Sequence, residues 1–178
     1  IGIDLIQANV TYTADTFPPN VNITFPLNNT NTSVTNLAIN FTVNDTNIQS
    51  CWWTNTSGRT NQTLANCGTN ISGFTWIEGI NNITVYANDT SNNVNTTTVK
   101  FTLDTIAPNV NITFPLNDST TASTSVEINY TVNDSNNGVG LNTCWWTNSS
   151  GKFNETITCG NNISARTWYE GINNITVY

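Results

Sequence analysis

The sequence predicts an all-β protein made of two tandem β-sandwiches, and three observations support this. Apolar and polar residues alternate along many short segments, as in Val21-Asn-Ile-Thr-Phe25, and this period of two places alternate side chains on opposite faces of a strand. Asn, Asp, Gly and Pro separate the segments at short intervals, as turn residues do. The pattern of the first half then recurs in the second, so one sandwich predicts another.

Four segments carry the repeat, and each recurs with nearly the same residues in the same order. We therefore predict a first repeat over residues 19–107, a second over residues 108–178, and a separate N-terminal segment over residues 1–18. The matching segments are 19–28 with 108–117, 39–45 with 128–134, 51–55 with 144–148, and 78–86 with 170–178.

Each strand of the first repeat follows from its own pattern. Val21, Ile23 and Phe25 share one face of the first strand, and Phe41 and Val43 belong to the second. The Cys-Trp-Trp segment and the segment ending at Tyr86 follow, and a hairpin at 87–93 leads to a last strand. The expected strands are 21–25, 37–43, 51–55, 78–86 and 99–103, with matching strands in the second repeat except the last.

The composition excludes several classes of function. Only four residues are Lys or Arg, and the formal net charge is −7, which argues against a nucleic-acid partner. The chain has no His, so no serine can be activated as in a hydrolase triad, and no phosphate-binding or dinucleotide motif is present. No apolar run reaches the roughly 20 residues that cross a bilayer. We expect neither an enzyme nor a membrane-spanning segment.

Asparagine is concentrated in Asn-X-Ser/Thr sequons. Charged residues make up only 8% of the chain, about a third of the usual quarter, so other polar groups must keep the surface soluble. The sequons exceed the number expected by chance and predict N-linked glycans, preferably on the outward side of the alternation. The predicted acceptors are Asn22, Asn40, Asn55, Asn61, Asn82, Asn111, Asn129, Asn148, Asn154 and Asn174.

Several segments resemble a known family. Asp104-Thr-Ile-Ala-Pro108, the pair Asn133-Asp134 and Gly79-Ile-Asn-Asn-Ile-Thr-Val-Tyr-Ala-Asn-Asp-Thr-Ser-Asn-Asn93 resemble the tandem immunoglobulin-like domains of bacterial and archaeal surface proteins. The richness in Asn and Thr and the Cys-Trp-Trp strand resemble archaeal members. The resemblance covers nearly the whole chain and implies immunoglobulin-like sandwiches at an extracellular cell surface. It says less about function, because this fold serves many roles.

Four cysteines occupy matching places in the two repeats. We expect one disulfide within each repeat, Cys51–Cys67 and Cys144–Cys159, each contributing roughly 3 kcal/mol on the chain-entropy model. Such bridges indicate an oxidising, extracellular setting. The alternative is a metal site or a reactive thiol, and it has less support because the chain lacks His and its cysteines are isolated.

A set of aspartates forms a candidate calcium site. In an immunoglobulin-like sandwich the linker before the first strand, the loop after the second strand and the last hairpin lie at one end. Carboxylates gathered at such a junction can bind Ca²⁺. The alternative is that they are turn residues with solvated charges, and no other cofactor is expected. The candidates are Asp15, Asp45 and Asp89 in the first repeat, and Asp104 and Asp134 in the second.

The tryptophan pairs Trp52-Trp53 and Trp145-Trp146 admit two interpretations. Their rings could stack on sugars, as exposed aromatic side chains do. Alternatively, one Trp of each pair belongs to the core, while its neighbour lies on the opposite face, partly exposed or covering the disulfide. The second interpretation is better supported, because neighbouring residues of a strand point to opposite faces.

The second repeat lacks the last strand that the first repeat has. Tyr178 matches Tyr86, whereas residues 10–19 match residues 99–108. The N-terminal segment is therefore a last strand without a sandwich of its own, with Val10, Tyr12 and Ala14 able to point inward. An unfilled position leaves unpaired backbone groups beside an apolar groove. We therefore expect the N-terminal strand of one copy to complete the second repeat of the next.

Such a contact is head-to-tail and can propagate without closing. The predicted function is that of a structural subunit of a glycosylated extracellular filament, a pilus or thread, similar to pilins and to archaeal threads built from donor strands. Its partners are identical subunits and, for adhesion, other cells or surfaces. The alternative is a spacer in a longer adhesin or surface-layer array, whose missing strand follows residue 178. The alternating segment Ile1-Gly-Ile-Asp-Leu-Ile6 favours the donor strand.

Overall fold

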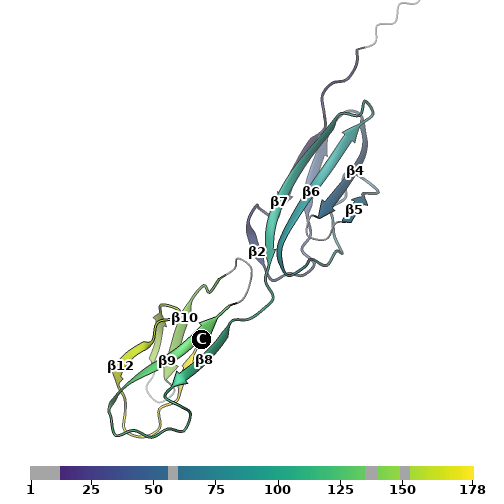
Figure 1. Ribbon diagram of the computed structural model, residues 1–178. Coiled ribbons are helices and arrows are strands. Elements are labelled where there is room, and N and C mark those ends of the chain that lie inside the picture. Colours follow the sequence, from purple (N-terminus) through teal and green to yellow (C-terminus); the bar gives the residue numbers. More distant parts are fainter. Residues whose placement is uncertain (1–12, 56–59, 135–139, 149–152) are drawn as a thin grey trace, which may run out of the picture. The chain divides into compact units, whose positions relative to one another are not determined.

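The computed structural model describes residues 13–55, 60–134, 140–148 and 153–178. Within these ranges the regular secondary structure is β-strand, with no helix, so the predicted all-β class is confirmed. The chain divides into two compact units (Figure 1). The first unit ends at Phe101, and the second comprises Thr102–Tyr178 together with Asn31–Ser33. The division therefore falls near the end of the last strand of the first sandwich rather than after residue 107.

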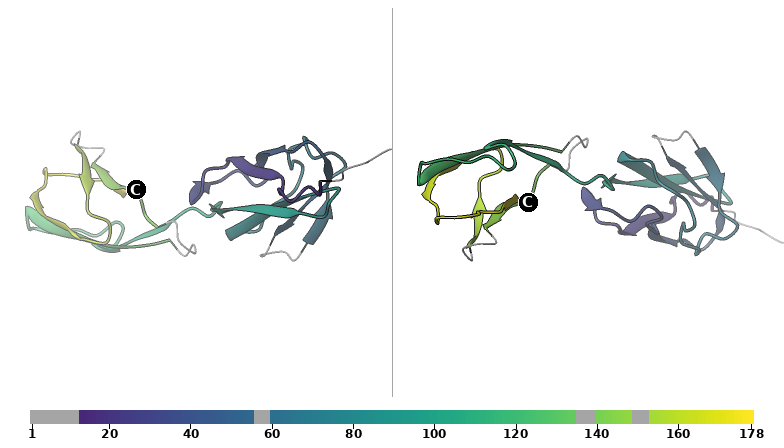
Figure 2. Two further views of the ribbon diagram at one scale, coloured as in Figure 1. Left: turned by 90° about the horizontal axis from the view of Figure 1, so that it is seen from above. Right: turned by 90° about the horizontal axis from the view of Figure 1, so that it is seen from below.

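The first unit is a sandwich of two sheets. Strands β1 and β3 form one sheet, and the other has the order β2-β7-β6-β4-β5. The two views of Figure 2 show these sheets as separate layers. The strands are β1 (Asn20–Phe25), β2 (Thr30–Thr32), β3 (Asn40–Asn44), β4 (Ile48–Asn55), β5 (Thr60–Thr63), β6 (Gly79–Asp89) and β7 (Val94–Leu103).

The core of this sandwich comes from the inward positions of the alternating strands. Along β6 every second residue is buried, because strand side chains alternate between the two faces of a sheet. Each large apolar side chain buried in this way stabilises the fold by roughly 1.5–3 kcal/mol. The buried side chains are Val21, Ile39 and Phe41 from one layer, and Trp53, Ile83, Val85, Val99, Phe101 and Leu103 from the other.

An aromatic cluster links the layers. The Trp76 ring contacts Trp53 and Phe101 edge-on, at centroid distances of 5.8 and 5.4 Å, a favourable geometry for aromatic pairs. The Trp76 indole N–H donates to the Leu37 carbonyl at 2.7 Å. Trp52 lies on the opposite face of β4, half-buried, and stacks on Tyr86 at 5.2 Å. One Trp of the pair is therefore core and its neighbour faces outward, as the sequence indicated.

Among the described residues, the second unit repeats this arrangement with fewer strands. Its sheets have the orders β12-β9-β8 and β11-β10-β13. Ile128, Tyr130, Trp146, Ile163 and Val177 form its buried core. The strands are β8 (Asn109–Phe114), β9 (Ser125–Asn133), β10 (Cys144–Asn148), β11 (Phe153–Ile157), β12 (Ile163–Thr167) and β13 (Ile175–Val177).

The repeated Gly-Ile-Asn-Asn segment has a structural role in both units. The Asn81 side-chain amide donates to the Ile77 and Gly79 carbonyls at 2.8 and 3.1 Å. Asn173 makes the equivalent bonds in the second unit, to the carbonyls of Tyr169 and Gly171. Gly79 has a φ of 90°, a conformation that glycine adopts without steric cost. The first Asn of the segment therefore fixes the turn at the start of β6 in the first unit and before β13 in the second.

Candidate functional site

Three aspartates meet at the N-terminal end of the first sandwich. Asp15 belongs to the segment that leads into β1, Asp45 follows the last residue of β3, and Asp89 is the last residue of β6. One carboxylate oxygen from each lies within 4.8 Å of those of the other two. The three candidates that the sequence places in the first repeat are thus brought together.

Each carboxylate accepts a hydrogen bond from a backbone amide nearby in the sequence. The amides of Phe17, Asn47 and Ser91 donate to Oδ1 of the aspartate two residues earlier, at 3.1, 2.7 and 2.9 Å. Such Asx turns are local features of aspartate in loops. They orient the three side chains while leaving the other oxygens of Asp15 and Asp45 outside these bonds.

Asn93 links two of the aspartates and was not foreseen from the sequence. Its side-chain amide donates to Asp89 Oδ2 at 2.8 Å and to the Asp15 carbonyl at 3.0 Å. Burial acts to raise the pKa of Asp89, but hydrogen bonds from the Asn93 side chain and from the Asn93 and Ser91 amides outweigh it and lower the pKa below its usual value. Asp89 therefore stays ionised although its side chain is buried.

The charge of this group has no counter-ion in the described part of the chain. Among the described residues, Arg166 forms an ion pair with Glu155, and no ion pair involves Asp15, Asp45 or Asp89. Two oxygens on opposite sides of one Ca²⁺, each at about 2.4 Å, are separated by about 4.8 Å. The spacing of the carboxylates therefore fits ligands of one Ca²⁺.

Two of the three aspartate positions recur in the second unit as Asp104 and Asp134. The Asp104 carboxylate accepts a bond from the Ile106 amide at 3.1 Å. Asp134 has a solvent-shielded Oδ1 without a hydrogen-bond partner among the described residues. Within those residues, Asp104 and Asp134 are not part of a three-carboxylate group. The 178 residues contain no counterpart of Asp89 there, because Tyr178 matches Tyr86.

A second feature of interest is the free edge of strand β13. In the first unit, β6 pairs with β4 on one side and with β7 on the other. β13 pairs with β10 in the same way, but no strand of the described residues lies on its other side. Such an edge leaves backbone N–H and C=O groups without strand partners.

Three apolar positions are less enclosed in the second unit than in the first. Each residue is buried in the first unit, and its equivalent in the second is half-buried. The pairs are Val21 and Val110, Trp76 and Trp168, and Ile83 and Ile175, with the buried residue named first.

Two of the predicted donor-strand residues, Val10 and Tyr12, lie outside the described residues. Ala14 lies within them and is exposed, in a segment without regular secondary structure. Phe17 nearby is 79% exposed. The side chains of Ala14 and Phe17 are therefore not buried in a groove of the first unit of the same chain.

The glycan predictions divide by burial. Asn55 and Asn148 are only 1% and 2% exposed, and Asn148 donates to the Asn173 side chain at 3.3 Å. These two predicted acceptors are therefore enclosed by the fold, and glycans on them stay a prediction. Asn40, Asn82 and Asn129 are half-buried. The exposed acceptors are Asn22, Asn61, Asn111, Asn154 and Asn174.

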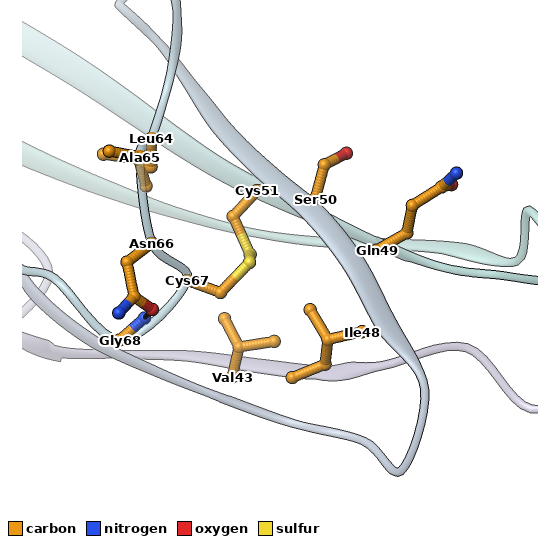
Figure 3. A pocket seen from close by; sticks show the side chains of 10 residues that line it. All are labelled: Val43, Ile48, Gln49, Ser50, Cys51, Leu64, Ala65, Asn66, Cys67 and Gly68. Atoms are coloured by element: carbon orange, nitrogen blue, oxygen red, sulfur yellow. Dashed lines mark hydrogen bonds between the residues drawn. A yellow bond between two sulfur atoms is a disulfide. The ribbon is translucent and has the colours of Figure 1, made fainter.

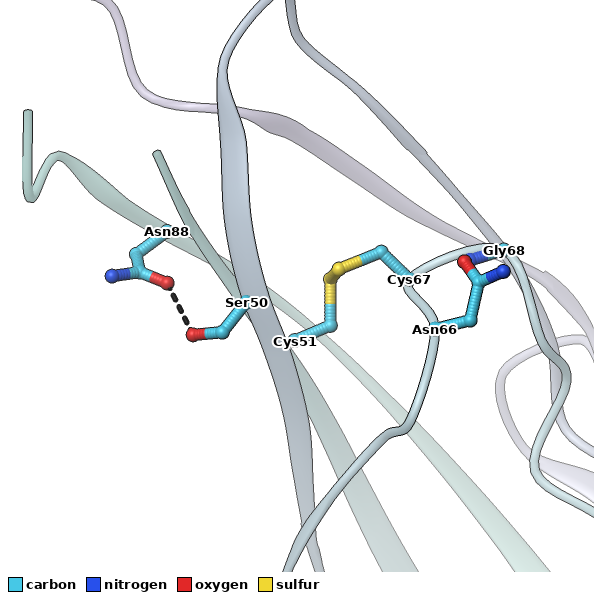
Figure 4. The surroundings of a disulfide bond; sticks show 6 residues. All are labelled: Ser50, Cys51, Asn66, Cys67, Gly68 and Asn88. Carbon is cyan, nitrogen blue, oxygen red and sulfur yellow. Dashed lines mark hydrogen bonds between the residues drawn. A yellow bond between two sulfur atoms is a disulfide. The ribbon is translucent and has the colours of Figure 1, made fainter. Parts of the chain in front are cut away.

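The structure contains the expected disulfides, Cys51–Cys67 and Cys144–Cys159, each with a Cα–Cα distance of 5.2 Å. In the first unit the bridge joins β4 to the loop after β5 (Figure 4). Ser50, next to Cys51, donates its hydroxyl to Asn88 on β6 at 2.5 Å. The bridge and this bond fix β4 from both sides.

An open pocket of about 460 Å³ lies beside the Cys51–Cys67 bridge. In Figure 3 the side chains of Val43 and Ile48 lie next to the two sulfur atoms. None of the ten residues that line this pocket is acidic or basic. The pocket therefore offers no side chain for acid–base chemistry.

Among the residues that the structure describes, no helix is long and apolar enough to cross a membrane. No protein-family model matches the sequence, and no curated protein matches it either. Among solved structures, the chain is similar to the fibronectin(III)-like modules of Clostridium thermocellum CbhA. The identity is 17% and the TM-score 0.41, over 89% of this chain and 84% of that chain. This similarity is too low to transfer an activity, a ligand or a partner.

Proposed function

We propose that the protein is a non-enzymatic structural subunit of a glycosylated extracellular filament. Residues 10–14 of one copy complete the second sandwich of the next by adding a strand beside β13. The observation that carries this proposal is the free edge of β13, together with three apolar residues that are half-buried in the second unit and buried at the equivalent positions of the first. Strand addition supplies backbone hydrogen bonds along the edge and side chains for the groove.

The first unit supplies the pattern that the added strand must match. Val99, Phe101 and Leu103 are 3%, 0% and 2% exposed within β7. Val10, Tyr12 and Ala14 stand at the same places of the matching segment. Each copy thus carries both halves of one joint, and a head-to-tail contact of this kind propagates into a filament.

An extracellular setting is supported by the chemistry of the chain. Two disulfides are typical of proteins that fold in oxidising compartments. The exposed sequon residues offer glycan acceptors on the surface of both units. If the protein from its native source had the intact mass of the bare polypeptide, the glycan part of the proposal would be wrong.

We expect the 178-residue chain to self-associate, and Tyr12→Asp to abolish this. The substitution would place an unpaired charge in an apolar groove, which costs several kcal/mol. Sedimentation velocity and negative-stain imaging measure the outcome. Asn9→Asp is the matched control, because Asn9 matches Thr98, an exposed residue of β7. This control should assemble like the parent chain.

A second variant distinguishes the filament from the alternative, a spacer in a longer array. Adding a copy of residues 87–103 after Tyr178 offers the missing strand within the same chain. If joints form between copies, the extended chain should stay monomeric, because its groove is filled. A parent chain that is monomeric, with a second sandwich that becomes stable only in the extended chain, would support the array instead.

We also propose that the group of Asp15, Asp45 and Asp89 binds Ca²⁺. The three carboxylates have the spacing of ligands to one ion, and Ca²⁺ takes its remaining oxygens from carbonyls and water. Because Asp15 precedes β1 and the other two follow β3 and end β6, a shared ion would fasten the N-terminal segment to the first sandwich. It would thereby set where the donor strand begins.

Millimolar Ca²⁺ should raise the melting temperature of the first sandwich. At a concentration 100-fold above Kd the stabilisation is about 2.7 kcal/mol. Asp45→Asn should remove the response, whereas Asp134→Asn, at the matching place of the second unit, should not.

The pKa of Asp89 is lowered in the fold, so its ionised form stabilises the fold above about pH 4 and this contribution is lost at lower pH. An equal melting temperature with Ca²⁺ and with a chelator at pH 7 would contradict the proposal.

A further inference from the structure

In the first unit, the turn after β1 holds one residue of β7 by both of its backbone groups. The Lys100 amide donates to Asn28 Oδ1 at 2.9 Å. The Lys100 carbonyl accepts a bond from the Asn29 amide at 2.7 Å. Asn29 has a φ of 65°, and the turn is closed by a bond from the Thr30 amide to the Leu27 carbonyl. We call residues 27–30 the first clamp.

The second unit has the same turn at residues 116–119, the second clamp. The Ser119 amide donates to the Leu116 carbonyl at 3.1 Å, the distance found in the first clamp. Asp118 has a φ of 60°, close to that of Asn29, although a non-glycine residue seldom adopts this conformation. Asn117 stands in the place of Asn28.

What differs is the strand that the clamp holds. Thr30–Thr32 forms β2 and pairs with β7, whereas the matching residues 119–121 form no strand. The Asn117 side-chain amide donates to its neighbour Asp118 at 3.0 Å. The second clamp thus has the geometry of a strand-holding turn, while no described strand lies in the position of β7.

A second contact lies on the inner face of the same position. Phe101 follows Lys100 and covers Trp76, which is 3% exposed. The counterpart Trp168 is half-buried and still packs on Trp146, at 5.8 Å. Trp146 is itself 1% exposed and has an indole N–H without an acceptor among the described residues. The aromatic cluster of the second unit therefore lacks the ring that completes the first.

We propose that these two contacts fix the register of the added strand, an inference that rests on the proposed function. The second clamp binds the backbone N–H and C=O of Thr11 from a neighbouring copy. The next residue, Tyr12, places its ring on Trp168. Thr11 and Tyr12 match Lys100 and Phe101, so a single register satisfies both contacts. A shift by one residue would turn every side chain of the strand to the wrong face.

The test measures one joint in isolation. The Tyr12→Asp chain can only accept a strand, and the chain extended by residues 87–103 can only donate one. Their mixture should form a one-to-one complex, whose Kd is measured by sedimentation. In the acceptor, Asn117→Ala should weaken this complex about tenfold, the effect expected for loss of one buried hydrogen bond. Asn162→Ala, at an exposed asparagine of the same unit, should leave Kd unchanged.

Donor variants separate the backbone contact from the ring contact. Thr11→Lys should bind normally, because the clamp touches only backbone atoms, whereas Thr11→Pro removes the N–H and should abolish the complex. Tyr12→Phe should bind within about threefold of the parent, and Tyr12→Leu at least tenfold more weakly, because aromatic pairs add stabilisation beyond area.

The outcomes distinguish the two proposals. If the donor and acceptor chains form no complex at all, the strand-addition function itself is wrong. If they form it but Asn117→Ala and Thr11→Pro leave Kd unchanged, the clamp is wrong and the filament stands. If Tyr12→Leu binds as tightly as the parent, the ring does not select the register.

Discussion

Replacing Phe101 with alanine should destabilise the first sandwich by about 3–5 kcal/mol, the cost of truncating a fully enclosed aromatic side chain. Phe101 is 0% exposed and contacts Trp76, so its removal leaves a cavity beside the Trp76 ring. The variant removes from the first unit the ring that has no counterpart beside Trp168 among the described residues. Trp76 should become solvated, and its fluorescence should shift to longer wavelength.

Denaturant unfolding, with hydrogen exchange to localise the loss, measures this effect. Amides of β6 and β7 should lose protection, while those of β9 and β10 should not. Lys100→Ala is the control, because the Lys100 side chain, next to Phe101, is exposed. Surface substitutions usually change the free energy of unfolding by no more than about 0.5 kcal/mol. If Phe101→Ala and Lys100→Ala had similar effects, β7 would not be the strand that completes the core, and the comparison between units would fail.

Much of the fold could be read from the sequence because alternate side chains are buried along central strands such as β4 and β6. The alternation Ile39-Asn-Phe41 has buried apolar residues and a half-buried asparagine between them, as a period of two requires. The same rule separates Trp53, which is core, from Trp52, which faces outward. The aspartate group followed from topology, since the segments that carry it share one end of a sandwich.

Other features could not be read in this way, because they depend on contacts between distant segments. Asn55 has the sequon pattern, yet it is buried, as is Asn148 in the second unit. A sequon reports neighbours in sequence and says nothing of burial. Asn93 was missed because its partner Asp15 is 78 residues away. The Asp-x-x-x-Asn spacing of Asp89 and Asn93 would have been a signal for this contact if it recurred in the second repeat.

Strand β2 was missed for a related reason. Its residues, Thr30 to Thr32, are polar and only three in number, so no alternation marks them. They form a strand because β7 lies alongside, and the Asn28 and Asn29 bonds to Lys100 bring them there. Their counterparts in the second unit, which lack such a neighbour among the described residues, form none. Tertiary pairing rather than local propensity decides this element.

Removing the disulfides should reveal how unequal the two sandwiches are. The bridges close loops with sequence separations of 16 and 15 residues, so the chain-entropy model gives each nearly the same stabilisation, about 3 kcal/mol. The double variants Cys51→Ala with Cys67→Ala, and Cys144→Ala with Cys159→Ala, should therefore have similar costs. Cys51 and Cys144 are both buried, which keeps the packing losses comparable.

The same loss of free energy of unfolding should affect the two sandwiches differently, because they differ in the strands that remain to hold each core together. The first retains β7 and its buried Val99, Phe101 and Leu103, so it should stay folded with a lower melting temperature. The second, with a free edge on β13, starts closer to the unfolding threshold and should lose its structure in the isolated chain. Mixing it with the strand-donating extended chain should restore part of the structure, because a partner that binds only the folded state stabilises it. Circular dichroism and hydrogen exchange, each with and without the donor, report these states. Two variants that stayed equally folded without a donor would show that the second sandwich is stable without an added strand, and the need for strand addition would disappear.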